Sequence, residues 1–222
     1  MAIYPGTERI INAAAEWRER SLLGGESVLS AVHVPLWTTD TLAEIKRNFV
    51  DRPDTGSATF MDKFRQQMAP ASPAAKRLAA EMLWVLLLFP NNISGAHKAN
   101  LLAEIWGWSG SELARQQPLI ADALRAGIGG AGQAFNNYRP AELTFFLFLM
   151  LDWRARARAE QEHLLSDPWR FGAWVDAVPG AANRQFRHML LHLLFPEFYE
   201  RVASSPHKRR IDAAFREMLD PA

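Results

Sequence analysis

Five basic side chains near the C-terminal end of the chain are the residues best suited to bind a negatively charged group. They are Arg184, Arg187, Lys208, Arg209 and Arg210. Residues 184–216 contain seven basic and three acidic side chains, whereas residues 1–111 contain eleven of each kind. Because lysine and arginine provide much of the affinity of proteins for phosphate backbones, these five residues are our predicted contact surface for DNA. The net charge of the whole chain is only +1, so overall composition does not indicate nucleic-acid binding.

A pair of histidines could ligate a metal ion. His188 and His192 are four residues apart, which places both imidazoles on one face of a helix. A metalloprotease motif needs a glutamate directly after the first histidine, but Met189 occupies that position. The chain has no cysteine and no obvious third ligand. We therefore predict no bound metal, and a metal-dependent hydrolase centred on these histidines is a minor hypothesis.

Three glycines match the spacing of the dinucleotide-binding fingerprint. Gly127, Gly129 and Gly132 follow a predicted helix and lie outside any βαβ unit, so we interpret the segment as a flexible loop. The sequence also contains no Walker A motif, no Gly-x-Ser-x-Gly elbow and no clustered pair of carboxylates. These observations predict that the chain is not an enzyme and has no cofactor.

The elements that must position these residues are helices, and one pair of helices is repeated. Residues 74–98 and 181–208 both contain Ala-Ala-x-Arg, Met-Leu, Leu-Leu-Phe-Pro and His-Lys in that order. Each copy indicates a helix, a proline stop and a new helix, which predicts two similar helical hairpins at about 74–106 and 181–219. The apolar stretch 143–151 predicts a buried helix around which they pack.

Helix signals also cover most of the remaining chain. Ser72-Pro73 and Asp167-Pro168 each place an N-cap residue before a proline in the first helical position. Residues 140–165 predict one long helix, residues 109–117 a short one, and residues 27–37 an edge strand or extended segment. We predict core positions for Trp106, Trp108, Trp153, Trp169 and Trp174. The whole pattern predicts an all-α, compact multi-helix bundle that forms a single domain over residues 1–222, with a break near 127–139 between two pseudo-symmetric halves.

Composition sets further limits on the class of protein. The chain is 49% hydrophobic and 22% charged, which is typical of globular proteins. The absence of cysteine fits a reducing compartment, and the N-terminal residues do not resemble a secretory signal. The longest apolar stretch is too short to span a bilayer. We therefore expect a cytoplasmic protein without a membrane partner.

Three segments resemble a known family: residues 15–23, residues 60–90 and, most specifically, residues 183–211. They are similar to the helical region that precedes the AAA+ motor domain in the McrB-like restriction ATPases of bacteria. In that family the motor hydrolyses nucleotide and a partner nuclease cleaves DNA. The resemblance implies an AAA+ motor and a nuclease as partners. The nucleotide-binding motifs of the motor are absent from these 222 residues, so no nucleotide-site residue is assigned here.

Two hypotheses for function follow from these observations. The first is a non-enzymatic recognition and coupling module of a McrB-like anti-phage restriction system, which binds DNA or a phage-derived trigger and relays the event to the motor. The alternative is a protein-interaction scaffold that docks a motor or nuclease subunit without binding DNA. The scaffold hypothesis predicts a contiguous apolar surface patch, and the first predicts DNA affinity that falls steeply with salt.

Overall fold

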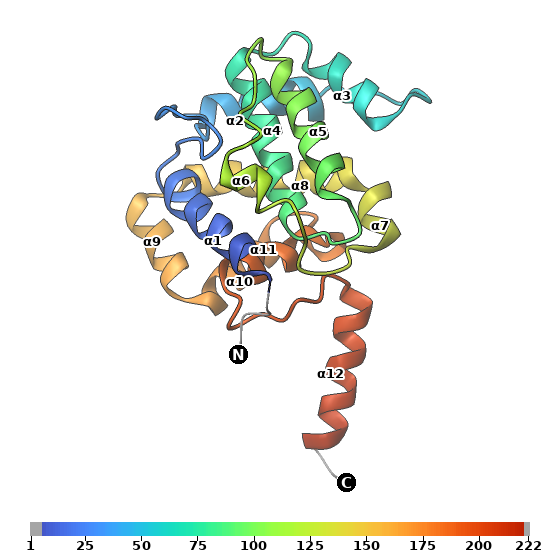
Figure 1. The fold of residues 1–222 in the computed structure, drawn as a ribbon. Coiled ribbons are helices and arrows are strands. Elements are labelled where there is room, and N and C mark those ends of the chain that lie inside the picture. The colour runs from blue at the N-terminus through green and yellow to red at the C-terminus, as the bar shows by residue number, and fades with distance from the viewer. Residues whose placement is uncertain (1–5, 220–222) are drawn as a thin grey trace.

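Helix α4 (Pro73–Leu88) lies at the centre of the structure, a computed structural model that describes residues 6–219. Four other helices pack against it: α1 (Glu8–Trp17), α2 (Thr39–Ile45), α5 (Gly95–Gly107) and α8 (Arg139–Ala155). Every side chain of α4 from Leu78 to Leu88 is buried. A helix that is apolar on all sides has to be enclosed by neighbours, and α4 is enclosed in this way (Figure 1).

The remaining helices surround this centre. They are α3 (Phe60–Met68), α6 (Pro118–Ala121), α7 (Gly132–Asn137), α9 (Arg158–Ser166), α10 (Pro168–Ala177), α11 (Phe186–Leu194), α12 (Ser205–Leu219) and the 3₁₀ turn η3 (Ala181–Asn183). Two π-helical segments, η1 (Arg18–Leu23) and η2 (Lys46–Val50), continue α1 and α2. The predicted all-α class is confirmed. No helix within residues 6–219 combines the length and the apolarity that crossing a bilayer requires.

The predicted helix starts at Ser72 and Asp167 are confirmed. The Ser72 hydroxyl accepts a hydrogen bond from the backbone N–H of Ala75 at 3.2 Å, and Pro73 takes the first helical position. Asp167 accepts from the N–H groups of the first turn of α10 at 2.9 and 3.2 Å. Both caps satisfy backbone donors that have no partner inside the helix.

The segment 27–37 is not a strand. Its backbone N–H groups at Val28 and Leu29 turn inward and donate to the carboxylate of Glu81 on α4, at 3.1 and 3.5 Å. The Trp37 indole donates to the same carboxylate at 2.7 Å. Because the chain curves around the buried side chain of Glu81, strand-like pairing in this segment is limited to an isolated bridge between Glu26 and Pro35.

Two helix predictions are wrong. The long helix expected over 140–165 breaks at Arg156, whose backbone is extended, and continues as α9. The side chain of Gln161 turns back and donates to the carbonyls of Trp153 and Arg156, which satisfies acceptors that the break exposes. Residues 109–117 form turns instead of a helix, and Gly110 there has a φ of +78°.

The segment predicted as a midpoint break lies against the end of α4. The N–H of Ile128 donates to the carbonyl of Phe89 at 2.8 Å, and the N–H of Asn91 donates to the carbonyl of Gly129 at 3.0 Å. Helix α1 also packs against α11, near the other end of the chain. The buried apolar residues therefore form one cluster, which extends from Ile10 to Ala203.

Candidate interaction surface

The second copy of the repeated segment ends in a helix that leaves the body of the protein. Helix α11 begins only at Phe186, because the preceding Ala-Ala-Asn forms the 3₁₀ turn η3 and Arg184 is extended. It packs against α1 and α10 and is buried except at Arg187. Helix α12 instead projects away from the other helices (Figure 1), and its residues 209–216 are all exposed. In the predicted second hairpin, α12 therefore points away from the body of the protein.

Arg184 and Arg187 stabilise the start of α11. The guanidinium of Arg184 lies 3.9 Å from the carboxylate of Glu142, and that of Arg187 donates to Asp176 at 2.6 Å. Their side chains are only 20% and 17% exposed. Glu142 also accepts the N–H groups of Gln185 and Phe186. Both arginines are therefore already engaged by carboxylates of the same chain.

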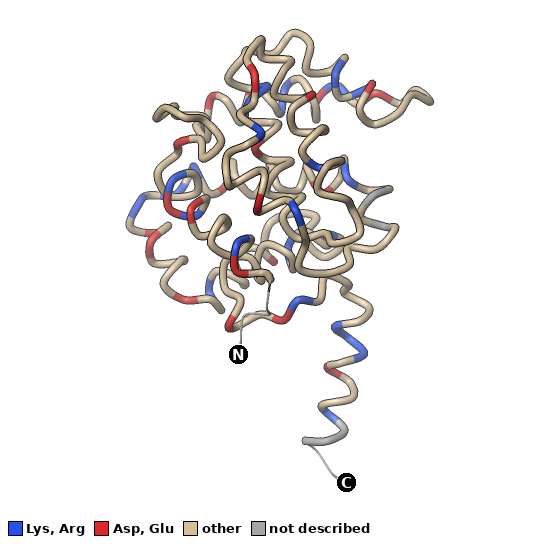
Figure 2. The backbone as a smooth tube through the Cα atoms, in the orientation of Figure 1, with Lys and Arg blue, Asp and Glu red and all other residues tan. Residues whose placement is uncertain are grey.

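Lys208 is also paired, whereas the two arginines after it are not. Its ammonium donates to Glu200 at 2.6 Å. Burial opposes ionisation of Glu200, but the hydrogen bond and charge of Lys208 outweigh it and lower the pKa of that carboxyl. Arg209 and Arg210 are exposed, and neither has an ion-pair partner within residues 6–219. Figure 2 shows basic positions near the start of α12. Two of the five predicted cations thus remain available to a partner.

His188 and His192 tether the segment that leads into α12. Nε2 of His188 lies 3.0 Å from the hydroxyl of Ser205, and Nδ1 of His192 donates to the carbonyl of Tyr199 at 2.6 Å. Burial, with the nearby charges of Lys208 and Arg187, lowers the pKa of His188 to about 3, and burial also lowers the pKa of His192. Both imidazoles are consequently neutral at pH 7.

The described residues contain no group of three or more histidine or carboxylate side chains that could hold a metal ion. One nitrogen of each imidazole is engaged by Ser205 or Tyr199. Both histidines are buried on α11. The geometry gives them a positioning role at the base of α12.

An apolar face on α12 was not identified from the sequence. Ile211 is 42% exposed and Phe215 is 60% exposed. With Ala214, Val202 and Arg210 they border an open pocket of about 500 Å³ in the angle between α12 and the segment before it. The spacing of Ile211 and Phe215, four residues apart, is the signal that could have revealed this face. Our sequence analysis concentrated on the cations beside it.

A second exposed apolar site lies at the start of α10. Trp169 is 65% exposed, which contradicts its predicted place in the core. Pro168 takes the first helical position, so Trp169 lies in the first turn, and its ring contacts Tyr199 at 5.5 Å between ring centroids. The Tyr199 hydroxyl donates to the carbonyl of Pro168 at 2.7 Å, which fixes this arrangement. Phe198 beside it is 50% exposed.

The glycine pattern at 127–132 has a packing explanation. A Cβ at Gly127 would lie 2.3 Å from the carbonyl oxygen of Pro90, so only glycine fits there. Lys98 is fully buried, and its ammonium donates to the carbonyls of Pro90 and Ala126 at 2.6 and 2.8 Å. Burial lowers the pKa of Lys98 to about 8. The loop is thus held against α4, which differs from the free, flexible loop that we predicted.

Comparisons with known proteins identified no relative of this chain. No protein-family model, curated protein or solved structure matches the chain. The resemblance to the helical region of McrB-like ATPases therefore rests on the three sequence segments alone, and the function has to be argued from the geometry of α12 and its base.

Proposed function

We propose that this chain is a non-enzymatic docking and coupling module that binds a partner protein through α12. Following the sequence resemblance, the partner is the AAA+ motor or nuclease subunit of a McrB-like anti-phage restriction system. One observation carries the proposal: α12 projects from the body and exposes Ile211 and Phe215 on one face. Exposed apolar side chains that lie together commonly mark a protein interaction site.

The chemistry of α12 describes the surface that it fits. An amphipathic helix with anchors four residues apart binds in an apolar groove of its partner. Arg209 and Arg210 precede the two anchors and lack intramolecular ion pairs among the described residues. Acidic side chains along the border of the groove would complement them and speed association. The partner surface is therefore an apolar groove with an acidic border.

The base of α12 provides the coupling. The contact of His188 with Ser205 and the ion pair of Lys208 with Glu200 connect the start of α12 to α11 and the segment after it. Helix α11 packs in turn against α1 and α10. A partner that moves α12 would consequently also displace α11 and the core helices packed against it.

The test is the affinity of the full chain for the AAA+ motor protein and the nuclease of the same system, measured by isothermal titration calorimetry. The double variant Ile211→Asp, Phe215→Asp should weaken binding at least about tenfold, since interface anchors are often worth more than 1 kcal/mol each. Val32→Asp is the matched control, because Val32 is 65% exposed and lies far from α12 in sequence. Equal affinity of the double variant and the wild type would refute docking through α12.

DNA is the second candidate partner, and the exposure of Arg209 and Arg210 favours it. The engagement of Arg184, Arg187 and Lys208 by carboxylates argues against a large phosphate-binding surface. Two free cations predict a logarithmic salt slope of about −2. Fluorescence anisotropy with duplex DNA at two salt concentrations tests this, with Arg209→Glu, Arg210→Glu as the variant. Absence of binding at low salt would eliminate DNA as a direct ligand.

A further inference from the structure

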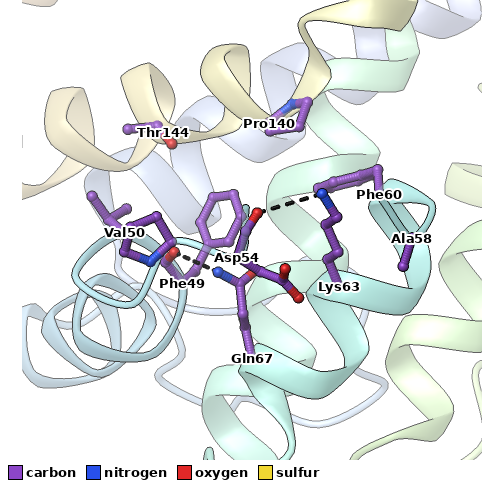
Figure 3. Close-up of a pocket in the computed structure, with 10 residues that line it drawn as sticks. Phe49, Val50, Asp54, Ala58, Phe60, Lys63, Gln67, Pro140 and Thr144 are labelled. Carbon is purple, nitrogen blue, oxygen red and sulfur yellow. Dashed lines mark hydrogen bonds between the residues drawn. The ribbon is translucent and has the colours of Figure 1, made fainter. Parts of the chain in front are cut away.

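A pocket of about 330 Å³ is lined in part by α3, a helix that lies at the end of the molecule opposite α12 (Figure 1). Its walls come from η2 and the loop after it, from α3 and from the first turns of α8 (Figure 3). Phe49, Val50, Pro53, Phe60 and Pro140 make most of the lining apolar. This size and this composition lie within the range of pockets that bind small molecules.

Two local features aim side chains into the pocket. The π-helical segment η2 ends with Phe49 and Val50, and π-helical turns occur frequently at functional sites. Helix α3 contributes Phe60, Lys63 and Gln67, whose spacing of three and four places them on one helical face. Phe60 also stacks on Phe64, with ring centroids 5.3 Å apart. The aromatic part of the wall is therefore fixed before any ligand arrives.

The loop 51–58 forms the remaining wall, and two side chains of α3 hold it. The amide of Gln67 donates to the carbonyls of Phe49 and Arg52 at 3.1 and 2.6 Å. The ammonium of Lys63 donates to the carbonyl of Asp54 (Figure 3) and to that of Gly56. The loop is exposed throughout, so these polar tethers, and not core packing, keep it over the pocket.

The charges of the lining define the class of ligand. Lys63 and Asp54 are the charged residues around the pocket, and they have opposite signs. The uncharged polar groups are the hydroxyl of Thr144 and the carbonyl of the Gln67 amide, which can bond an N–H or O–H at the edge of a ring. We propose that this pocket binds a small, uncharged aromatic compound that carries one hydrogen-bonding group. The proposal does not depend on the docking function of α12.

Indole is the probe, because it is a neutral aromatic ring with a single N–H donor. We expect methyl signals of Val50, Ala58 and Thr144 to shift in NMR spectra of the full chain, with a dissociation constant on the order of 1 mM. Benzoate and benzylammonium should bind at least about fivefold more weakly. The carboxylate of benzoate would be repelled by Asp54, and the ammonium of benzylammonium would be repelled by Lys63. Absence of saturable shifts with indole overturns the pocket, and equal affinity for a charged ring overturns the ligand class.

Two variants locate the binding. Thr144→Phe fills the pocket from α8 and should reduce indole affinity at least about tenfold. Gln67→Leu keeps the apolar contact but removes the tether of the loop, and it should weaken indole binding severalfold. The Gln67→Leu variant still tests the location of the binding site if Thr144→Phe does not fold. Val32→Phe enlarges an exposed valine elsewhere and should leave indole affinity unchanged. If both pocket variants bind indole like the wild type, the site lies elsewhere and the proposal is wrong.

Discussion

The two copies of the repeated segment share an order of residues but differ in what the second helix contacts. In the first copy α5 packs along α4, and the buried ammonium of Lys98 donates to two carbonyls. In the second copy α12 leaves the body, and Lys208 pairs with Glu200 near the surface. Lys98 follows Pro90 by eight residues and Lys208 follows Pro196 by twelve. The same helix pattern therefore gives a hairpin packed in the core in the first copy and a projecting helix in the second, where the connection after the proline is longer.

The equivalent positions Glu81 and His188 show the same contrast. Glu81 is fully buried and accepts hydrogen bonds from the hydroxyls of Ser21 and Ser27, the indole of Trp37 and backbone N–H groups. Among the described residues, the side chain of His188 makes one hydrogen-bond contact, with the hydroxyl of Ser205. The first copy thus gathers an earlier part of the chain onto the core, and the second orients the helix that follows it.

The largest expected effect comes from Glu81→Leu. Removing the carboxylate leaves several buried donors without an acceptor, and we expect a loss of about 4 kcal/mol in the free energy of unfolding. Urea denaturation followed by circular dichroism measures it. Glu81→Gln is the control of similar shape, which keeps one acceptor and should lose less. A loss below about 1 kcal/mol in Glu81→Leu would contradict the anchoring role.

The second prediction compares the apolar faces of α5 and α12. Ile105 is fully buried, whereas Ile211 is 42% exposed. Ile105→Ala should lower the free energy of unfolding by about 3 kcal/mol, because it opens a cavity. Ile211→Ala should change it by less than about 0.5 kcal/mol. Equal losses in the two variants, measured in the same urea titration, would mean that α12 packs on the body in solution.

The third prediction compares the two lysines. Lys98→Met leaves two buried carbonyls unsatisfied and should cost about 2 kcal/mol, whereas Lys208→Met removes a partly exposed ion pair and should cost less than about 1 kcal/mol. Burial lowers the pKa of Lys98 from 10.5 to about 8, so between these values the unfolded chain binds more protons than the native protein. The stability of the wild type relative to Lys98→Met should therefore increase as the pH rises from 8 to 10.5. A constant difference across this range would show that Lys98 is not buried as a cation.

The last comparison concerns His188→Leu, whose expected effect at pH 7 is smaller than those of Glu81→Leu, Ile105→Ala and Lys98→Met. It removes one hydrogen bond of a neutral imidazole and should cost about 1 kcal/mol. The pKa of His188 is lowered from 6.5 to about 3, so the wild type loses stability as the pH falls between these values, because only the unfolded chain takes up the proton. The variant should lack this part of the acid sensitivity. Faster amide hydrogen exchange at residues 205–210 of the variant would show that the tether of α12 has been released.

Local signals predicted much of the fold. Ser72-Pro73 and Asp167-Pro168 identified helix starts because a cap and a proline act within one turn. The break at Arg156 was missed because the side chain that satisfies it, Gln161, lies in the next helix. The course of segment 27–37 depends on Glu81, which is distant in the sequence.

The candidate surface was harder to predict for the same reason. Whether a basic residue is free depends on acidic residues elsewhere in the chain, and Glu142 and Asp176 occupy Arg184 and Arg187. No pattern within residues 184–210 reveals those partners. A useful signal did exist at Glu81, since a single charge within an apolar helix predicts a buried residue with several hydrogen-bond donors around it.

The projection of α12 also determines how strongly it can hold a partner. A helix of 15 residues is only marginally stable in water without tertiary contacts, so we expect α12 to fray in the free protein and to become fully helical when it docks in the groove proposed above. Part of the binding free energy then offsets the entropy of ordering the helix. Circular dichroism should gain helical signal when the complex forms, and the complex should dissociate readily. Under the proposed docking function, such an arm would give a specific contact that can be made and broken repeatedly.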